Sequence, residues 1–292
     1  MSTAATAEPV AVVPPAAPRR PGRRRLVNSV WGIVAWAAGI VFVFPVIWMV
    51  LTSFKQENAA ATNPPTWVFE PTLDQYAQVF DRNMMPFLLN SLMASVFSTL
   101  LVVLLATPAA YALSLRPVAK WSDSLFFFIS TKMMPVVAAF LPVYLVVKHL
   151  GLLDNVWTMV VLYTSMNLPL AIWMMRSFLL EVPREVLEAG EVDGAGLLTS
   201  IRKIILPIVS PGLAATALIC FIFAWNEFFL ALNLTATNAS TAPIFLVGFI
   251  SSEGAFLARL CAAATIVSLP VLIAGWLAQN KLVRGLSMGA VK

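Results

Sequence analysis

The chain has 292 residues, of which 60% are hydrophobic and only 11% are charged, and its formal net charge at pH 7 is +5. About a quarter of the residues in soluble domains are charged, so most of this chain is expected to lie in lipid. Because one transmembrane helix takes about 20 apolar residues, this length allows several membrane spans and leaves no room for a separate soluble domain beside them.

Residues that could carry catalysis or hold a metal are scarce. The two cysteines, Cys220 and Cys261, lie in apolar runs and lack the spacing of a zinc site or a disulfide framework. The single histidine, His149, would have to support any catalytic triad or histidine metal centre alone. The sequence also lacks a Walker-type glycine loop for a nucleotide. It therefore predicts a chain that is not an enzyme and binds no cofactor or metal, with any ATP hydrolysed on another subunit.

Residues 1–29 are predicted to form a disordered tail with a basic end. Residues 1–18 mix alanine, proline, valine and threonine with one charge, Glu8, and residues 19–25 contain five arginines. The apolar run that follows is longer than the roughly 7–15 residues of a signal-peptide core. Residues 30–292 are therefore assigned to one membrane domain.

Six apolar runs are long enough to cross a membrane, which predicts an all-α integral membrane protein. They cover residues 31–51, 87–115, 125–147, 156–178, 204–232 and 257–277. Each run contains a proline, which removes a backbone donor and kinks a helix. Such helices can rock against one another, although prolines are also common in membrane helices without that role.

Lysines and arginines are distributed unevenly over the loops. If the amino terminus is cytoplasmic, fourteen of the nineteen lie on the cytoplasmic side and four on the other, with Lys132 inside the third run. Because cytoplasmic loops are enriched in positive charge, both termini are predicted to be cytoplasmic.

The loop at residues 181–207 is the densest cluster of charge outside the amino terminus. A short helix, a sharp turn and a second helix are indicated by a proline suited to a first helical turn, acids placed where the helix dipole favours them, and an Asp-Gly pair. These residues are Pro183, Glu185, Glu188, Asp193 and Gly194. A hairpin needs only a few connecting residues, and an anionic membrane surface would repel the acids. The loop is therefore expected to bind a protein partner.

The spacing of this loop resembles the EAA motif of ABC importer permeases: Glu-Ala-Ala, three residues, Gly, nine residues, Ile-x-Leu-Pro. The matching residues are Glu188, Ala189, Gly190, Gly194, Ile204, Leu206 and Pro207. Gly190 replaces the second alanine and should loosen the helix by about 1 kcal/mol. The resemblance implies that residues 181–203 form a coupling helix, which seats in a groove of the ATP-hydrolysing subunit and transmits its closure to the spans. Glu185 and Asp193 belong to the same coupling set.

The resemblance extends along most of residues 30–292 and is greatest to MalG-type carbohydrate permeases. The stretches 223–228 and 282–292 look like family signatures, and 132–135 and 167–178 look closest to permeases for sugar alcohols. This resemblance implies a six-helix permease of the type I ABC importer kind in a bacterial inner membrane. It also implies a second homologous permease, two ATP-binding subunits, an extracytoplasmic substrate-binding protein and a small sugar or polyol as substrate, with no nucleic-acid partner.

Two ionisable residues, Lys132 and Glu227, lie inside apolar runs, where an unpaired charge costs at least about 2.5–3.5 kcal/mol. In one interpretation they line the translocation path together with Asn226, and Trp225 stacks on a sugar ring. In another, the two charges pair structurally, or Lys132 extends its ammonium group to the cytoplasmic interface. The pair would also suit an ion- or proton-coupled secondary transporter, the alternative function, although no internal repeat typical of such folds is visible.

Overall fold

The computed structural model describes residues 21–115, 119–251 and 254–290, with side chains described from residue 29 to 279 except at 116–118 and 251–255. The chain divides into two units, residues 1–48 and 49–292. Helix α1 (Pro21–Ser53) forms the described part of the first unit and continues into the second.

The start of α1 differs from the predicted tail. Residues 1–20 lie outside the described residues, but 21–29 are helical. Proline is well suited to the first position of a helix, and arginine is a good helix former. The helix therefore begins before the apolar run that was expected to define it.

The predicted number of membrane spans agrees with the structure. Five helices in the described part of the chain are long and apolar enough to cross a membrane, and one bent helix pair passes the same test as a sixth. Besides α1, the long helices are α4 (Met84–Ser114), α7 (Val156–Leu179), α10 (Leu206–Trp225) and α13 (Leu257–Ala290). The all-α membrane fold is thereby confirmed, with one two-residue antiparallel pairing of β1 (Ile250–Ser251) and β2 (Gly254–Ala255) added to it.

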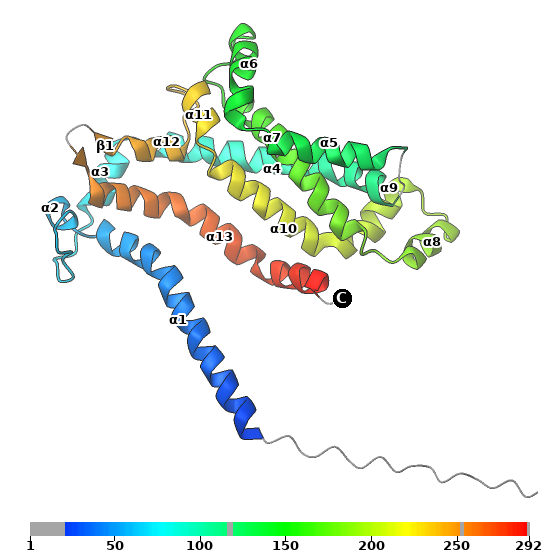
Figure 1. Cartoon of the computed structure of the whole chain (residues 1–292). Coiled ribbons are helices and arrows are strands. Elements are labelled where there is room, and N and C mark those ends of the chain that lie inside the picture. The colour runs from blue at the N-terminus through cyan, green and yellow to red at the C-terminus, as the bar shows by residue number, and fades with distance from the viewer. Residues whose placement is uncertain (1–20, 116–118, 252–253, 291–292) are drawn as a thin grey trace, which may run out of the picture. The chain divides into compact units, whose positions relative to one another are not determined.

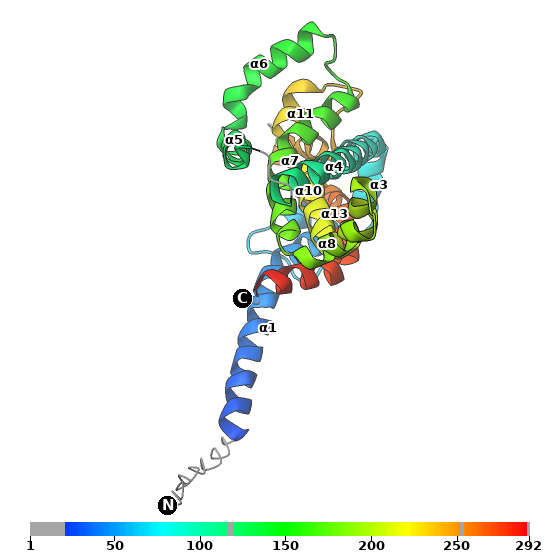
Figure 2. The same ribbon diagram turned by 90° about the vertical axis from the view of Figure 1, so that its right-hand side faces the viewer.

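The prediction of a continuous third span at 125–147 is wrong. Helices α5 (Trp121–Met133) and α6 (Val136–His149) meet at 90°, and α6 turns away from α5 (Figure 2). Met134 adopts an extended backbone with ψ 128°. Pro135 favours this break, because its ring disfavours the helical conformation of the residue before it and it has no N–H group to donate.

The predicted fifth span, 204–232, also breaks. Helix α10 ends at Trp225, and a separate short helix, α11 (Phe229–Leu234), follows. The Glu227 carboxylate accepts hydrogen bonds from the backbone N–H groups of Leu230 at 2.8 Å and Ala231 at 3.2 Å. Because those donors belong to the first turn of a helix, Glu227 caps α11 instead of continuing α10.

Helices α4, α7 and α10 lie side by side and form the centre of the second unit, with α13 against α10 (Figure 1). Small side chains on α4 allow the close approach, as is usual between membrane helices. Those buried on α4 include Ala94, Ser95, Ser98, Ala106 and Ala110. Gly212 of α10 lies directly against the ring of Phe178 from α7, where an added Cβ atom would collide. This packing holds the three spans in register.

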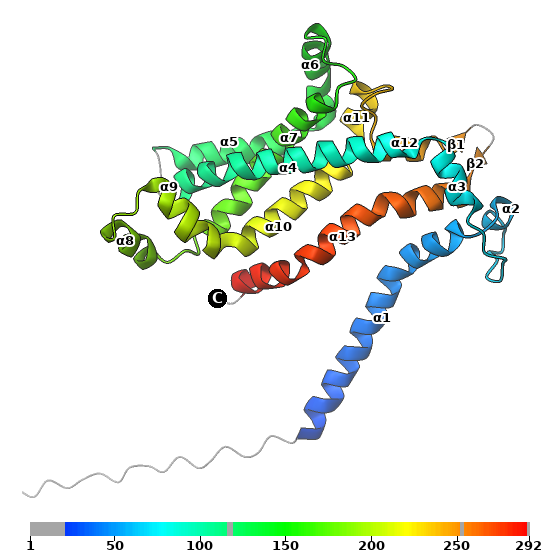
Figure 3. The ribbon, with the colours of Figure 1, turned by 180° about the vertical axis from the view of Figure 1, so that it is seen from behind.

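The two ends of the second unit carry different elements (Figure 3). One end holds α2 (Glu57–Ala60), α3 (Asp74–Asp81), α12 (Ala242–Val247) and the β1–β2 pairing. The other end holds α8 (Arg184–Val192), α9 (Leu197–Thr199) and a π-helical segment, Ser200–Ile205. The charged loop therefore projects from one end of the bundle.

Candidate functional site

The first half of the charged loop folds as the sequence predicts. Helix α8 starts directly after Pro183, and the turn at Gly194 has a φ of +77°, which favours glycine. The N–H of Gly194 donates to the carbonyl of Glu191 at 3.0 Å, and that of Ala195 to the carbonyl of Gly190 at 2.9 Å. These two bonds close the end of α8 and reverse the chain.

The second half of the loop departs from a regular α-helix. Residues Ser200–Ile205 are π-helical, and the N–H of Leu206 donates to the carbonyl of Ile201, five residues back. Pro207 has no N–H group with which to bond the carbonyl of Lys203, four residues earlier, which favours the wider turn. The loop thus joins α10 through an irregular segment.

Gly190 is buried where α8 meets the π-helical segment. An added Cβ atom would lie 2.5 Å from Cδ1 of Ile204 and 4.0 Å from Cβ of Ala195. The sequence identified Gly190 only as a departure that loosens the helix. The structure adds that this glycine allows α8 to lie close to Ile204.

The predicted coupling residues fall into two groups. Those with exposed side chains or backbone are Glu185, Glu188, Ala189, Asp193, Gly194 and Pro207, and those turned at least partly inward are Gly190, Ile204 and Leu206. Val182 and Ile205 at the two ends of the loop are buried together with Ala110 of α4 and Met175 of α7. The loop therefore presents acids and small residues outward while apolar side chains attach it to three spans.

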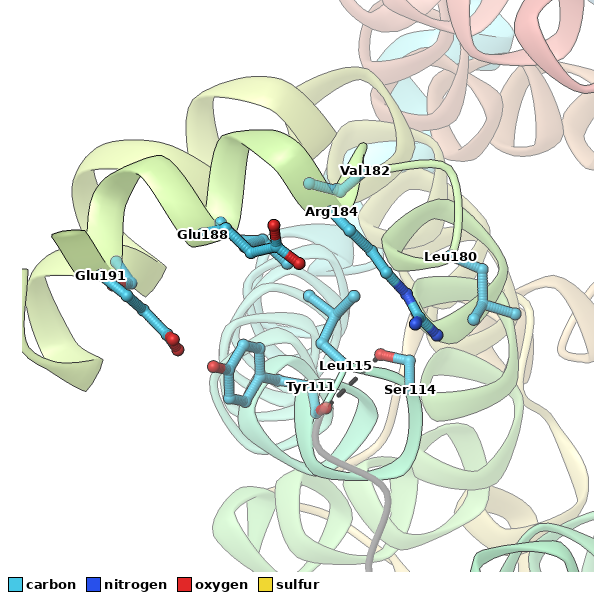
Figure 4. A pocket seen from close by; sticks show the side chains of 10 residues that line it. Tyr111, Ser114, Leu115, Leu180, Val182, Arg184, Glu188 and Glu191 are labelled. Carbon is cyan, nitrogen blue, oxygen red and sulfur yellow. Dashed lines mark hydrogen bonds between the residues drawn. The ribbon is translucent and has the colours of Figure 1, made fainter.

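A cavity of about 490 Å³ separates α8 from the end of α4 (Figure 4). Arg184 and Glu188 point into it from α8, and Tyr111 and Ser114 face them from α4. A second cavity of about 700 Å³ beside Gly194 shares Tyr111 and Glu191 as lining residues. Sequence patterns do not reveal such cavities. Because of them, α8 is only partly packed on the side that faces α4.

Lys132 lies in the last turn of α5, at the break in the third span, and is exposed. Its Nζ atom donates to the carbonyl of Met166 at 3.2 Å and lies 5.4 Å from the ring centroid of Phe223. It lines a cavity of about 370 Å³ between the α5–α6 bend and α7. The elements α5, α6, α7 and α11 all contribute to this cavity.

The structure does not bring Lys132 and Glu227 together as an ion pair among the residues it describes. Glu227 is used in capping α11, and Asn226 is exposed, with its Nδ2 donating to the carbonyl of Ile222 at 2.8 Å. Trp225 is only 2% exposed, and its indole N–H donates to the carbonyl of Val267 at 3.1 Å. The expected stacking of Trp225 on a substrate does not fit this placement, because its ring belongs to the packed core.

Asp154 was not singled out from the sequence, yet it organises the end of the bundle opposite α8. Its carboxylate accepts hydrogen bonds from the backbone N–H groups of four consecutive residues, 236 to 239, at 2.9–3.1 Å. Burial alone would raise the pKa of Asp154, but these bonds outweigh it and lower the pKa to about 2. Asp154 itself has a φ of +54°, a conformation that aspartate tolerates. The loop before α7 is thereby tied to the segment between α11 and α12.

The chain is similar in sequence to several known permease proteins of transport systems. The chain is 36% identical over 94% of its length, and 97% of the relative's, to the probable ABC transporter permease protein y4oR of Sinorhizobium fredii. It is 34% identical to the sulfoquinovosyl glycerol transport system permease protein SmoH of Agrobacterium fabrum, covering 88% of this chain and 92% of SmoH. It is 30% identical to the trehalose transport system permease protein SugB of Mycobacterium tuberculosis, covering 93% and 99%.

Solved structures agree on the fold. A crystal structure of a bacterial ABC transporter involved in the import of the acidic polysaccharide alginate contains a chain that matches with a TM-score of 0.73 at 22% identity, over 91% of this chain and 100% of that one. A family model described as binding-protein-dependent transport system inner membrane component matches residues 102–283. The chain therefore belongs to this family of inner-membrane transport components, as the charged loop indicated.

Proposed function

We propose that this chain is the membrane-spanning permease subunit of an ATP-driven importer for a carbohydrate or sugar alcohol. A second homologous permease, two ATP-binding subunits and an extracytoplasmic substrate-binding protein complete the transporter, and ATP is hydrolysed on the ATP-binding subunits. Relatives named as permeases for trehalose, for sulfoquinovosyl glycerol and for maltodextrin support a sugar substrate.

The observation that carries the coupling role is the way α8 is attached. Glu185, Glu188 and Asp193 are exposed, while Val182 and Ile205 are buried against α4, α7 and α10. A partner that grips the exposed face moves the buried side chains with it, because closely packed interiors transmit displacement. The cavity behind α8 gives the helix room for such movement. Closure of the ATPase subunits would thus reach three spans through one loop.

Charge supports a cytoplasmic position for α8. The end of the bundle that carries α8 includes Lys120, Arg176, Arg184, Arg202 and Lys203. Outside the α8 end, the described lysines and arginines include Lys55 and Arg82 in connecting segments, Lys148 in the last turn of α6 and Arg259 in the first turn of α13. Together with the arginines of the amino-terminal segment, this distribution favours cytoplasmic termini.

The translocation path in this proposal includes Lys132 and Asn226, both exposed where their spans break. Glu227 acts as a positioning residue, because its carboxylate binds the start of α11, which contributes Leu230 to the cavity beside Lys132. Helix breaks are a common place for polar sites in membrane transporters.

Substitution of Gly194 by arginine tests the coupling role. Arginine introduces bulk and strain at a φ of +77°. We expect either the amount of ATPase subunit that co-purifies with the permease, or the amount of substrate taken up per ATP hydrolysed, to fall at least about tenfold. The permease pair should remain assembled, since Gly194 has open space around it.

Gly151→Arg is the matched control, because Gly151 also has a positive φ of +67° and open space but lies at the other end of the bundle. Equal ATPase retention and uptake in both variants would contradict the coupling role of α8. Uptake that persists after ATP depletion would contradict the ATP-driven importer itself.

A further inference from the structure

We propose that Lys132 forms a subsite for a negatively charged group, a carboxylate or sulfonate, on the transported sugar. The inference rests on the proposed function and narrows its substrate class to acidic sugars.

The position of the ammonium group is the first observation. Lys132 is exposed in the wall of a cavity of about 370 Å³, within the range of roughly 300–1,000 Å³ typical of small-molecule sites. An ammonium group has three donors, and one of them is used by the carbonyl of Met166 at 3.2 Å. Two donors therefore remain for a ligand, and the Phe223 ring lies below the charge.

The second observation is the lack of a counter-charge. No carboxylate of the described residues lies within ion-pair distance of Lys132, and Glu227, the acid expected nearby from the sequence, has its two oxygens on the N–H groups of Leu230 and Ala231. A cation in a membrane span without a partner is unfavourable by at least about 2.5–3.5 kcal/mol. An anion that enters the cavity removes this unfavourable term, whereas a neutral hydroxyl removes little of it.

The remaining wall suits one sugar unit. Ser165 offers a hydroxyl oxygen whose proton is directed to the carbonyl of Leu162 at 2.8 Å, so its lone pairs can accept from a sugar hydroxyl. Phe140 and Pro169 supply apolar surface for the carbon face of a ring. Hydrogen bonds to an ionised group are about twice as strong as neutral ones, so Lys132 should dominate recognition in this cavity.

Ligand binding to the complete transporter tests the proposal. The complex of this chain with its partner permease and ATPase subunits, in lipid nanodiscs without the binding protein, is titrated with radiolabelled glucuronate and with glucose, which differ only in a carboxylate or a hydroxymethyl group at C6. We expect glucuronate to bind at least about tenfold more tightly, equivalent to about 1.4 kcal/mol. Lys132→Gln should remove the preference, Lys132→Arg should keep it, and Lys120→Gln, an exposed lysine at the start of α5, should leave it unchanged.

Three results would overturn the inference. These are equal binding or no binding of the two sugars to the wild-type complex, a preference for glucuronate that survives Lys132→Gln, and separation of the two permeases by Lys132→Gln, which would assign the counter-charge to the partner permease. Binding-protein-dependent ATP hydrolysis is measured on the same samples. If it is present while glucuronate shows no preference, the acidic substrate is wrong and the importer stands. If it is absent from the wild type, the importer itself is wrong.

Discussion

The two ends of the bundle use their acidic residues in opposite ways. At the end with α2 and α12, Asp154 binds four backbone N–H groups, and Glu57 binds those of Ala258 and Arg259 at the start of α13. At the α8 end, Glu185, Glu188 and Asp193 are exposed, and their carboxylates make no hydrogen bond with another residue in the part of the chain that the structure describes. Acids that bind the chain's own amides fix loops, and acids left outward can bind another protein.

The two ends of the bundle also differ in how tightly their segments are packed. Asn90 of α4 also binds the segment after α11. Its Nδ2 donates to the carbonyls of Asn238 at 2.8 Å and Ser240 at 3.0 Å. Helix α8 instead stands over a cavity of about 490 Å³ and is followed by a π-helical segment. Loops with few internal bonds and a hollow behind them open at low free energy. The α8 end is therefore held by fewer contacts than the end that carries Asp154.

Filling the hollow behind α8 should have the largest effect on this contrast. Ser114→Phe places a ring in the cavity from the end of α4, and we expect coupled ATP hydrolysis and uptake to fall about tenfold because α8 loses its room to move. Thermal stability should be unchanged or slightly higher, since apolar burial is favourable.

Ser177→Phe, on the exposed face of α7, is the control and should retain coupling. Uptake and ATP hydrolysis in reconstituted vesicles measure both variants. Full coupling in Ser114→Phe would show that the cavity is not used for movement.

Breaking the fixed end should affect stability more than coupling. Asp154→Ala leaves four backbone N–H groups without their acceptor, and we expect a loss of roughly 2 kcal/mol of stability. Hydrogen exchange at residues 236–239 should accelerate, while co-purification of the ATPase subunits stays normal. Slow exchange retained in Asp154→Ala would mean that other contacts hold the segment.

Lowering the pH should destabilise the end of the bundle that Asp154 holds, within a defined pH range. The pKa of Asp154 is lowered to about 2 from an ordinary value of 3.8, so its contribution is complete above about pH 4 and is lost as the pH falls towards 2. Asp154→Asn removes this ionisation and should flatten that part of the pH dependence. The thermal midpoints of the wild-type and variant complexes are measured between pH 5 and pH 2.5. If the two midpoints fall in parallel as the pH is lowered, ionisation of Asp154 does not contribute to stability.

The contrast between the ends also shows what sequence patterns can predict. Local signals placed the turn at Gly194 and the helix after Pro183, because a positive φ and a helix start depend on one or two residues. The EAA-like spacing from Glu188 to Pro207 pointed to the same loop through its resemblance to a known family, and the structure places this loop at one end of the bundle. Asp154 was missed because its partners lie more than 80 positions away in the sequence, and no local pattern reports such a contact.

The two broken spans were missed for a different reason. Residues 125–147 and 204–232 are apolar throughout, and hydropathy does not distinguish a straight helix from a bent one. Pro135 was visible, but Pro108 and Pro169 occur inside continuous helices. Whether a proline ends a helix is decided by packing around it, which the sequence does not display.

The smallest effect is expected at Gly190, where α8 contacts Ile204 of the π-helical segment. Alanine favours a helix by about 1 kcal/mol over glycine, but its Cβ would lie 2.5 Å from Cδ1 of Ile204, the flexible end of a side chain. These two effects oppose each other, so Gly190→Ala should change stability by less than about 1 kcal/mol. Ile204→Val removes the Cδ1 atom and should therefore be less destabilising with alanine at 190 than with glycine. A double-mutant cycle on thermal stability measures this difference, and strictly additive effects would mean that Gly190 does not set the distance between α8 and Ile204.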